Sequence, residues 1–268
     1  MKVVIYCGGQ GLRLRDYSEN TPKPMVPVGY RPIVWHLMKY YAHYGHKEFI
    51  LCLGYRADAI KDYFLRYNEC TTNDFVLTKG GRDVQLLSTD ISDWKITFVD
   101  TGMNASCGER LCAVKHHLGD DEMFMANYAD CLTDAPLPTM IERFQKTDAI
   151  CSFLSAIPPY SFHSIRTNEA GEVTDMVDAV KLDLWINGGY HIYRKEIFDY
   201  INEGEDLVPI VYRRLAAHKK LITYRHDGFW ACMDTFKEKM TLDDLDARGQ
   251  APWQVWNKSV SSASKRTA

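Results

Sequence analysis

The sequence lacks the features that mark three large classes of protein. No apolar run reaches the ~18–20 residues of a transmembrane helix. The eight cysteines include no C-x-x-C pair, so their spacing predicts neither a zinc site nor a disulfide framework. A formal net charge of −3 over 268 residues predicts no general attraction to nucleic acid or to anionic membranes.

The N-terminus and the cysteines indicate the cellular setting. The apolar segment Val3–Cys7 is too short for the hydrophobic region of a secretory signal, and it runs directly into glycines. Several cysteines stand within apolar runs, which is typical of buried, reduced thiols. We therefore expect a cytoplasmic protein. Its 46% hydrophobic and 25% charged residues are ordinary for a folded globular chain and exclude general disorder.

The apolar pattern alternates between strands and helices. Residues 2–7 form a continuous apolar run typical of a buried strand, and a helical period follows from Ile33 to Gly45. A strand over Glu48–Leu53 repeats the rhythm, which predicts an α/β fold with a parallel sheet covered on both faces. After Pro158 the pattern becomes more antiparallel, so we expect a mixed, mostly parallel sheet.

No linker or internal repeat divides the chain. We expect one domain over residues 1–256 and a disordered tail over residues 257–268, where apolar periodicity ends. Residues 73–92 interrupt the alternation and predict a hairpin, which is a candidate for a subunit contact or a lid.

A glycine-rich loop follows the first predicted strand. Gly8, Gly9 and Gly11 would let backbone N–H groups approach an anion closely. Their spacing does not fit a dinucleotide fingerprint, because Leu14 stands at the place of the third glycine, and no Gly-Lys-Ser/Thr of a P-loop occurs. Taken alone, a glycine-rich loop of this kind is more often a tight structural turn than a binding site.

Basic residues follow the glycines. Arg13 stands two positions after the last glycine, and Lys23 lies between two prolines that fix the local backbone. Arg110 falls in the first turn of a predicted helix, where exposed N–H groups favour an anion. Solvated surface side chains are the alternative for each of these residues, but the combination with the glycines favours a phosphate site.

Two aspartates are candidates for a metal site. Asp130 ends an apolar strand over Met123–Tyr128, and Asp234 follows another apolar run. Carboxylates at the carboxyl ends of parallel strands face the ligand crevice, and Mg²⁺ prefers a few carboxylates together with phosphate oxygens. From the residues alone, helix N-capping is the favoured role of both aspartates.

The motifs together resemble the sugar-1-phosphate nucleotidyltransferases. The family pattern G-G-x-G-T-R-L appears at Gly8–Leu14, and P-K-P-M appears at Pro22–Met25. The similarity covers about residues 1–256 and is greatest to the cytidylyltransferase branch. The branch features include Trp185–Gly189, His226–Trp230 and Met233–Thr235.

The resemblance implies a single Rossmann-like nucleotidyltransferase domain that forms homo-oligomers. It implies the reaction NTP + sugar 1-phosphate → NDP-sugar + pyrophosphate, with CTP as the expected nucleotide and glucose 1-phosphate or a related acceptor. It assigns Mg²⁺ to Asp130 and Asp234, and catalytic charge neutralisation to Arg13 and Lys23. Nucleotide contacts are assigned to Gly8, Gly9, Gly11, Arg13, Gly108 and Arg110, and acceptor contacts to Asn187, Gly188 and Gly189.

The chain departs from the family pattern in several places. Leu12 replaces a threonine of the glycine loop, and Cys131 replaces the glycine that follows the metal aspartate. Ala179 stands where the family has a lysine that grips the sugar phosphate, and Lys181 is the candidate replacement. These changes predict that nucleotidyl transfer is kept and that the acceptor differs. The alternatives are another NTP, an acceptor such as a modified sugar, cyclitol or phosphonate, or a non-catalytic nucleotide or sugar-phosphate binding protein.

Overall fold

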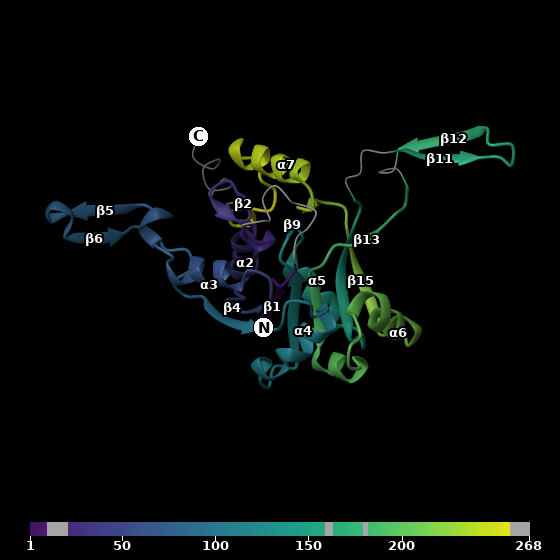
Figure 1. The fold of residues 1–268 in the computed structure, drawn as a ribbon, viewed down its shortest axis with the longest axis horizontal. Helices are drawn as coiled ribbons and strands as arrows, with labels where there is room; N and C mark the ends of the chain where they lie inside the picture. The colour runs from purple at the N-terminus through teal and green to yellow at the C-terminus, as the bar shows by residue number, and fades with distance from the viewer. Residues whose placement is uncertain (10–20, 159–162, 179–181, 258–268) are drawn as a thin grey trace.

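A mixed sheet forms the centre of the molecule. The computed structural model describes residues 1–9, 21–158, 163–178 and 182–257. Among these residues eight strands form the central sheet (Figure 1). They are β1 (Val3–Tyr6), β4 (Glu48–Leu53), β7 (Lys95–Asp100), β8 (Met123–Tyr128), β10 (Cys151–Ala156), β13 (Ile186–Asn187), β14 (His191–Arg194) and β15 (Leu221–His226).

The strand order is that of an open α/β sheet. β7, β4, β1 and β8 are neighbours and run parallel to one another. β14 is antiparallel to β8 and to β10, while β15 runs parallel to β10 along its whole length. β13 pairs with the end of β10, also antiparallel. The expected mixed, mostly parallel sheet is confirmed.

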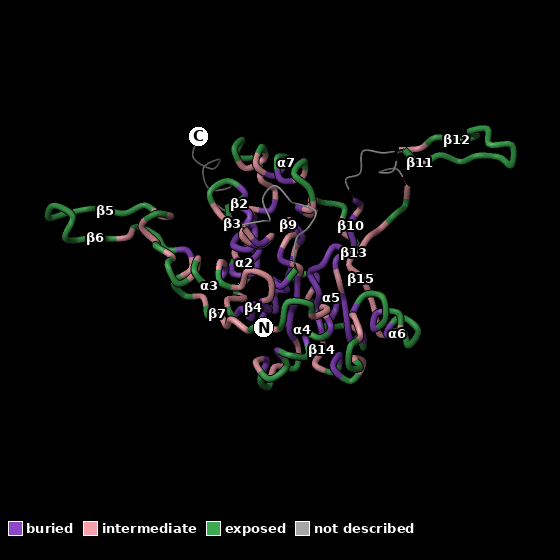
Figure 2. The backbone as a smooth tube through the Cα atoms, viewed as in Figure 1, coloured by how far each residue is buried: buried purple, intermediate pink, exposed green. Residues whose placement is uncertain are grey.

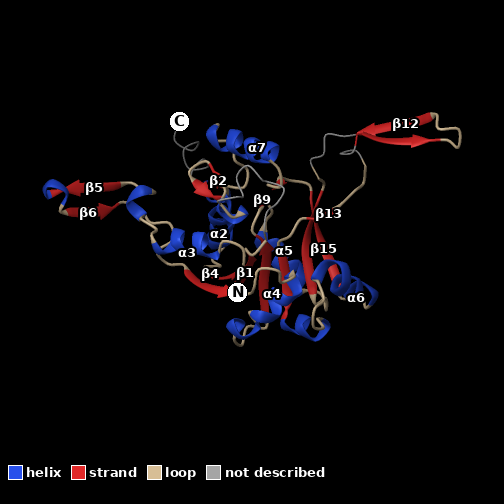
Figure 3. Ribbon diagram, in the orientation of Figure 1, coloured by secondary structure: helices blue, strands red, loops and turns tan. Residues whose placement is uncertain are grey.

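Helices cover both faces of the sheet (Figure 3). Val3 and Ile5 of β1 belong to one hydrophobic core, and Val4 and Tyr6 belong to the other. Burial on both faces explains why the first strand is a continuous apolar run instead of an alternating one. The helices are α2 (Ile33–His43), α3 (Ala57–Leu65), α4 (Cys107–Ala113), α5 (Leu137–Gln145), α6 (Tyr212–Ala217) and α7 (Phe236–Ala247).

In the described part of the chain, four strand pairs lie outside the central sheet. Two of them are hairpins that project from opposite sides of the body and are exposed over most of their length (Figure 2). The predicted hairpin within residues 73–92 is one of these and is confirmed. The pairs are β2 (Pro27–Val28) with β3 (Arg31–Pro32), β5 (Phe75–Thr78) with β6 (Asp83–Leu86), β9 (Cys131–Thr133) with β16 (Trp230–Cys232), and β11 (His163–Thr167) with β12 (Val173–Asp178).

The end of the described chain packs against α2. Trp253 is 1% exposed and its indole N–H donates to His36 Nδ1 at 3.3 Å. The Trp256 ring stands edge-on to Trp35, with 6.0 Å between the centroids. These contacts join residues 251–257 to the core. No helix in the described part of the chain is long and apolar enough to cross a membrane.

Candidate active site

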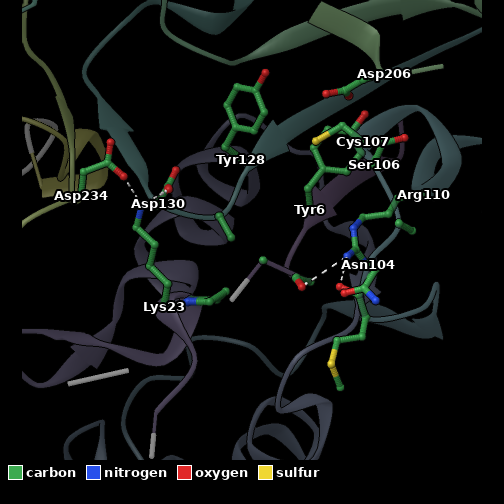
Figure 4. A pocket seen from close by; sticks show the side chains of 16 residues that line it. Tyr6, Lys23, Asn104, Ser106, Cys107, Arg110, Tyr128, Asp130, Asp206 and Asp234 are labelled. Atoms are coloured by element: carbon green, nitrogen blue, oxygen red, sulfur yellow. Dashed lines mark hydrogen bonds and ion pairs between the residues drawn. The ribbon is translucent and has the colours of Figure 1, made fainter. Parts of the chain in front are cut away.

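A cavity of about 600 Å³ opens at the carboxyl ends of β1 and β8 (Figure 4). Gly8 and Gly9, which follow β1, line one part of it, and Tyr128 and Asp130 at the end of β8 line another. Ser106, the N-cap residue of α4, also lines the cavity. Ligands of open α/β sheets bind in this crevice, so the cavity is the natural candidate for the active site.

Lys23 lies between the two predicted metal aspartates. Its ammonium nitrogen forms ion pairs with Oδ2 of Asp130 and Oδ1 of Asp234 (Figure 4). Burial acts to lower the pKa of Lys23, but the charge of Asp130 and hydrogen bonds to both carboxylates outweigh it and raise the pKa above its usual value. Lys23 is therefore a fixed positive charge at the cavity wall.

The pairing of β9 with β16 brings the two aspartates together. Asp130 immediately precedes β9, and Asp234 follows β16 by two residues. The Met233 N–H donates to the Asp130 carbonyl at 2.9 Å, which extends the strand pairing to the site. The two carboxylates come from positions 104 apart in the sequence (234 − 130) and converge on one ammonium group.

The capping alternative does not account for Asp234. Thr235 caps α7, since its side chain accepts from the Glu238 N–H at 3.3 Å and the Glu238 carboxylate accepts from the Thr235 N–H at 2.8 Å. Two carboxylates that already share one cationic group, beside a cavity, are a donor set that suits Mg²⁺. The residues present therefore fit a magnesium ion.

Arg110 is buried and fully engaged with the chain around it. It is 4% exposed, and its guanidinium donates to the carbonyls of Leu53, Gly8 and Met103 and to Thr101 Oγ1, at 2.7–3.3 Å. A Cβ at Gly8 would lie 2.0 Å from Arg110 Nη1, so a larger residue there would displace the guanidinium. In this structure Arg110 ties the end of β1 to the loop after β7, and its contact with a nucleotide phosphate stays a prediction.

The other predicted glycines have different surroundings. Gly9 lines the cavity, and a Cβ there would meet nothing within 4 Å. A Cβ at Gly108 would lie 2.1 Å from the backbone oxygen of Glu205. The absent side chain of Gly108 therefore lets α4 pack closely on residue 205, and Gly108 is not among the residues that line the cavity.

The predicted acceptor residues lie at the end of β13 and in the turn that leads to β14. Asn187 Nδ2 donates to the hydroxyl of Tyr128, a cavity residue, at 3.5 Å. The carbonyl of Gly188 accepts from the indole N–H of Trp230 at 2.8 Å, and Gly189 has a φ of +80°. None of Asn187, Gly188 and Gly189 lines the cavity itself. Their acceptor role stays a prediction, as do the roles of Gly11, Arg13 and Lys181, which lie outside the described residues.

The sequence motifs did not single out every residue that lines the cavity. Asp206 and Cys107 both line it, on the side opposite Asp130 (Figure 4). Burial, and then the charge of Asp206, raise the pKa of Cys107 to about 12, so its thiol stays protonated and is no nucleophile. Neither residue stands in a motif. Asp206 precedes a short helix over Leu207–Val211 and resembles an ordinary cap.

Comparisons with known proteins identify relatives that align with nearly the whole chain. A family model described as "Nucleotidyl transferase" matches residues 2–235. A "Probable glucose-1-phosphate cytidylyltransferase" of Bacillus subtilis is 35% identical over 260 residues, which cover 96% of this chain and 100% of that protein. The glucose-1-phosphate cytidylyltransferase of Salmonella typhimurium is 33% identical over 258 residues, with the same coverage.

Solved structures share the architecture. A UDP-glucose pyrophosphorylase complexed with UDP-glucose matches with a TM-score of 0.67 at 18% identity, over 92% of this chain and 98% of that one. HddC from Yersinia pseudotuberculosis matches with a TM-score of 0.62 at 20% identity, over 91% and 98%. At these identities the two structures establish the α/β fold alone.

Proposed function

The chain belongs to the nucleotidyl transferase family, and from that premise we propose that it joins CTP and a sugar 1-phosphate into a CDP-sugar and pyrophosphate. Glucose 1-phosphate is the first acceptor to consider, since it is named for both cytidylyltransferase relatives. The observation that carries the proposal is the position of Lys23 between Asp130 and Asp234 at the cavity wall.

The proposed reaction needs charge neutralisation more than proton transfer. An oxygen of the sugar phosphate attacks the α-phosphorus of the nucleotide. A phosphorus–oxygen bond forms there, and the bond to pyrophosphate breaks. The attacking phosphate is already anionic, so the enzyme needs no general base for it. Positioning and electrostatic stabilisation then supply the rate enhancement.

The chain's own residues supply these two contributions. Asp130 and Asp234 would hold Mg²⁺, which when bound neutralises phosphate charge. Lys23 would then direct its ammonium group to the phosphates, because its present partners would be engaged by the metal ion. Arg110 holds the carbonyl of Gly8 at the cavity edge, where the backbone of the glycine loop would meet the nucleotide.

The identity of the acceptor is the open part of the proposal. The family lysine is replaced by Ala179, and the nearby Lys181 is our candidate for the contact with the sugar phosphate. We retain the prediction of an altered acceptor, with a modified sugar, a cyclitol or a phosphonate as the classes to compare with glucose 1-phosphate.

A matrix of nucleotides and acceptors tests the proposal. Pyrophosphate release is measured with CTP, UTP, ATP and GTP, each with Mg²⁺ and each acceptor class. We expect CTP to support the fastest release. No release with any combination would contradict nucleotidyl transfer, and a faster rate with another nucleotide would contradict the choice of CTP. Glucose 1-phosphate as the best acceptor by a wide margin would contradict an altered acceptor.

We further propose that residues 1–256 act as one catalytic domain and that the protein is a homo-oligomer. The projecting β5–β6 hairpin supports the second point. Leu77 and Leu87 are 56% and 62% exposed on it. A two-stranded hairpin with exposed leucines is marginal alone in water, so contact with a second copy would stabilise it.

A further inference from the structure

Two cysteines from distant strands face each other beside Asp130. Cys131 of β9 pairs directly with Cys232 of β16 in antiparallel register. The Asp130–Met233 and Asp134–Phe229 pairs on either side are joined by backbone hydrogen bonds. Bonded pairs alternate along such a ladder, so the cysteines form a non-hydrogen-bonded pair, in which opposite side chains approach most closely.

The Asp130 carboxylate completes a compact set of three donors. The Cys131 thiol donates to Asp130 Oδ1 at 3.2 Å, while Oδ2 of the same carboxylate pairs with Lys23. Ligand atoms of Asp130, Cys131 and Cys232 all lie within 4.8 Å of one another. Asp130 therefore faces two neighbouring positions, one at Lys23 and one at the thiols.

We propose that Cys131, Cys232 and Asp130 bind a thiophilic divalent cation of the Zn²⁺ class. Zinc accepts sulfur together with carboxylate oxygen in a four-coordinate site, whereas Mg²⁺ prefers oxygen alone, so the two sulfurs select the softer ion. Three protein ligands leave one position for water. Cys131 is 3% exposed, which shields one metal–sulfur bond from solvent.

The proton and charge balance of this site is favourable. Each thiol releases its proton to solvent as its sulfur–metal bond forms. A divalent cation with two thiolates and one carboxylate carries a net charge of −1. The negative charge beside Lys23 is thus retained, and the ammonium group keeps an ionic partner.

The cation would inhibit nucleotidyl transfer by occupying Asp130. A carboxylate bound to zinc is withdrawn from Mg²⁺, so added Zn²⁺ lowers activity at fixed Mg²⁺. This consequence rests on the proposed function, but binding itself does not and is measured without substrate. Failure of the enzyme assay and failure of metal binding are therefore distinguishable.

Cadmium titration of the full-length, phosphine-reduced protein tests the site through the ultraviolet sulfur-to-cadmium charge-transfer band. We expect a band that saturates at one equivalent in the wild type. Cys232→Ser and Cys131→Ser should each weaken binding more than about 100-fold, since even outer-shell changes cost 10–100-fold. Cys112→Ser, which changes an exposed cysteine, should bind like the wild type.

Two outcomes would overturn the site. One is the lack of a stoichiometric band in wild-type protein whose thiols titrate as fully reduced. The other is an unchanged band in Cys232→Ser. The partly exposed Cys232 decides the test if Cys131→Ser does not fold.

Discussion

Lys23 pairs with both carboxylates of the candidate metal site. In Lys23→Met the carboxylates of Asp130 and Asp234 would lose their shared cation and repel each other. Mg²⁺ should then stabilise the variant more than the wild type, because no ammonium group competes for the carboxylates. Each kcal/mol of added stabilisation raises the melting temperature by about 2–4 °C.

Thermal unfolding with and without Mg²⁺ measures this effect. Lys95→Met is the control, since the Lys95 side chain is 73% exposed and pairs with Glu48 far from the aspartates. It should respond to Mg²⁺ like the wild type. An equal Mg²⁺ response in Lys23→Met and Lys95→Met would argue against a metal site at the aspartates.

A second prediction concerns the contribution of the Arg110 side chain to stability. Arg110→Lys removes the guanidinium hydrogen bonds to the Gly8 and Met103 carbonyls, and the loss of a hydrogen bond made by a charged group costs roughly 1.5–3 kcal/mol. We expect a loss of about 3 kcal/mol in the free energy of unfolding, measured in urea. Arg66→Lys is the matched control, because Arg66 is 80% exposed and pairs with Asp62. Equal stability of the two variants would refute the structural role of Arg110.

His36 connects stability to pH. Burial lowers its pKa to about 4, against about 6.5 in the unfolded chain. The unfolded chain therefore binds more protons between these values. Above pH ~6.5 the protonation of His36 does not reduce the free energy of unfolding. As the pH falls towards ~4, the free energy of unfolding decreases by about 3 kcal/mol, because the unfolded chain takes up this proton more readily than the folded one. Protonation would also end the hydrogen bond from Trp253, which requires an unprotonated Nδ1.

Urea unfolding at pH 7 and pH 4.5 checks the sign and size of this effect. His36→Asn should lose less stability than the wild type over this range, by up to about 3 kcal/mol. His116→Asn, at an exposed position, should follow the wild type. An unchanged pH dependence in His36→Asn would show that His36 does not titrate as described.

At the scale of elements, we predict that the β5–β6 hairpin contacts a second copy of the chain in the oligomer. Leu77→Glu places a charge on an exposed apolar position. In sedimentation experiments the Leu77→Glu variant should form smaller species than the wild type. Its midpoint of unfolding should change little. Leu65→Glu changes an exposed leucine of α3 and should leave the assembly intact. A wild-type protein that sediments as a monomer would contradict the interface.

Elements with strong local patterns could be predicted from the sequence. β8 spans Met123–Tyr128 as expected, because its apolar run is bounded by polar residues. The helix predicted to begin around Arg110 divides into α4, which ends at Ala113, and a 3-10 turn over Lys115–Leu118. Strands β13 and β14 are separated around Gly189, whose positive φ ends the extended conformation.

The sequence predicts which types of residue form the site. It does not predict which of them contact each other. The motif around Lys23 and the strand-end position of Asp130 pointed to phosphate and metal chemistry. Their direct ion pair depends on β9 meeting β16 across about a hundred residues, which no local period encodes. The same pairing joins Cys131 to Cys232, so a search for closely spaced cysteines could not find that cluster.

At the scale of the whole molecule, a nearly neutral chain concentrates opposite charges in one crevice. The sheet places them there, because the parallel strands β1 and β8 end side by side at the cavity. We therefore predict that Asp130 acts in the reaction and is not merely part of the scaffold.

Pyrophosphate release by Asp130→Ala, with saturating CTP, sugar 1-phosphate and Mg²⁺, tests that claim most directly. Loss of a metal-binding carboxylate should lower turnover on the order of 10³-fold or more, while the variant still unfolds cooperatively. Asp244→Ala, at an exposed helix position paired with Arg248, should keep wild-type turnover. Wild-type pyrophosphate release by folded Asp130→Ala would contradict the account.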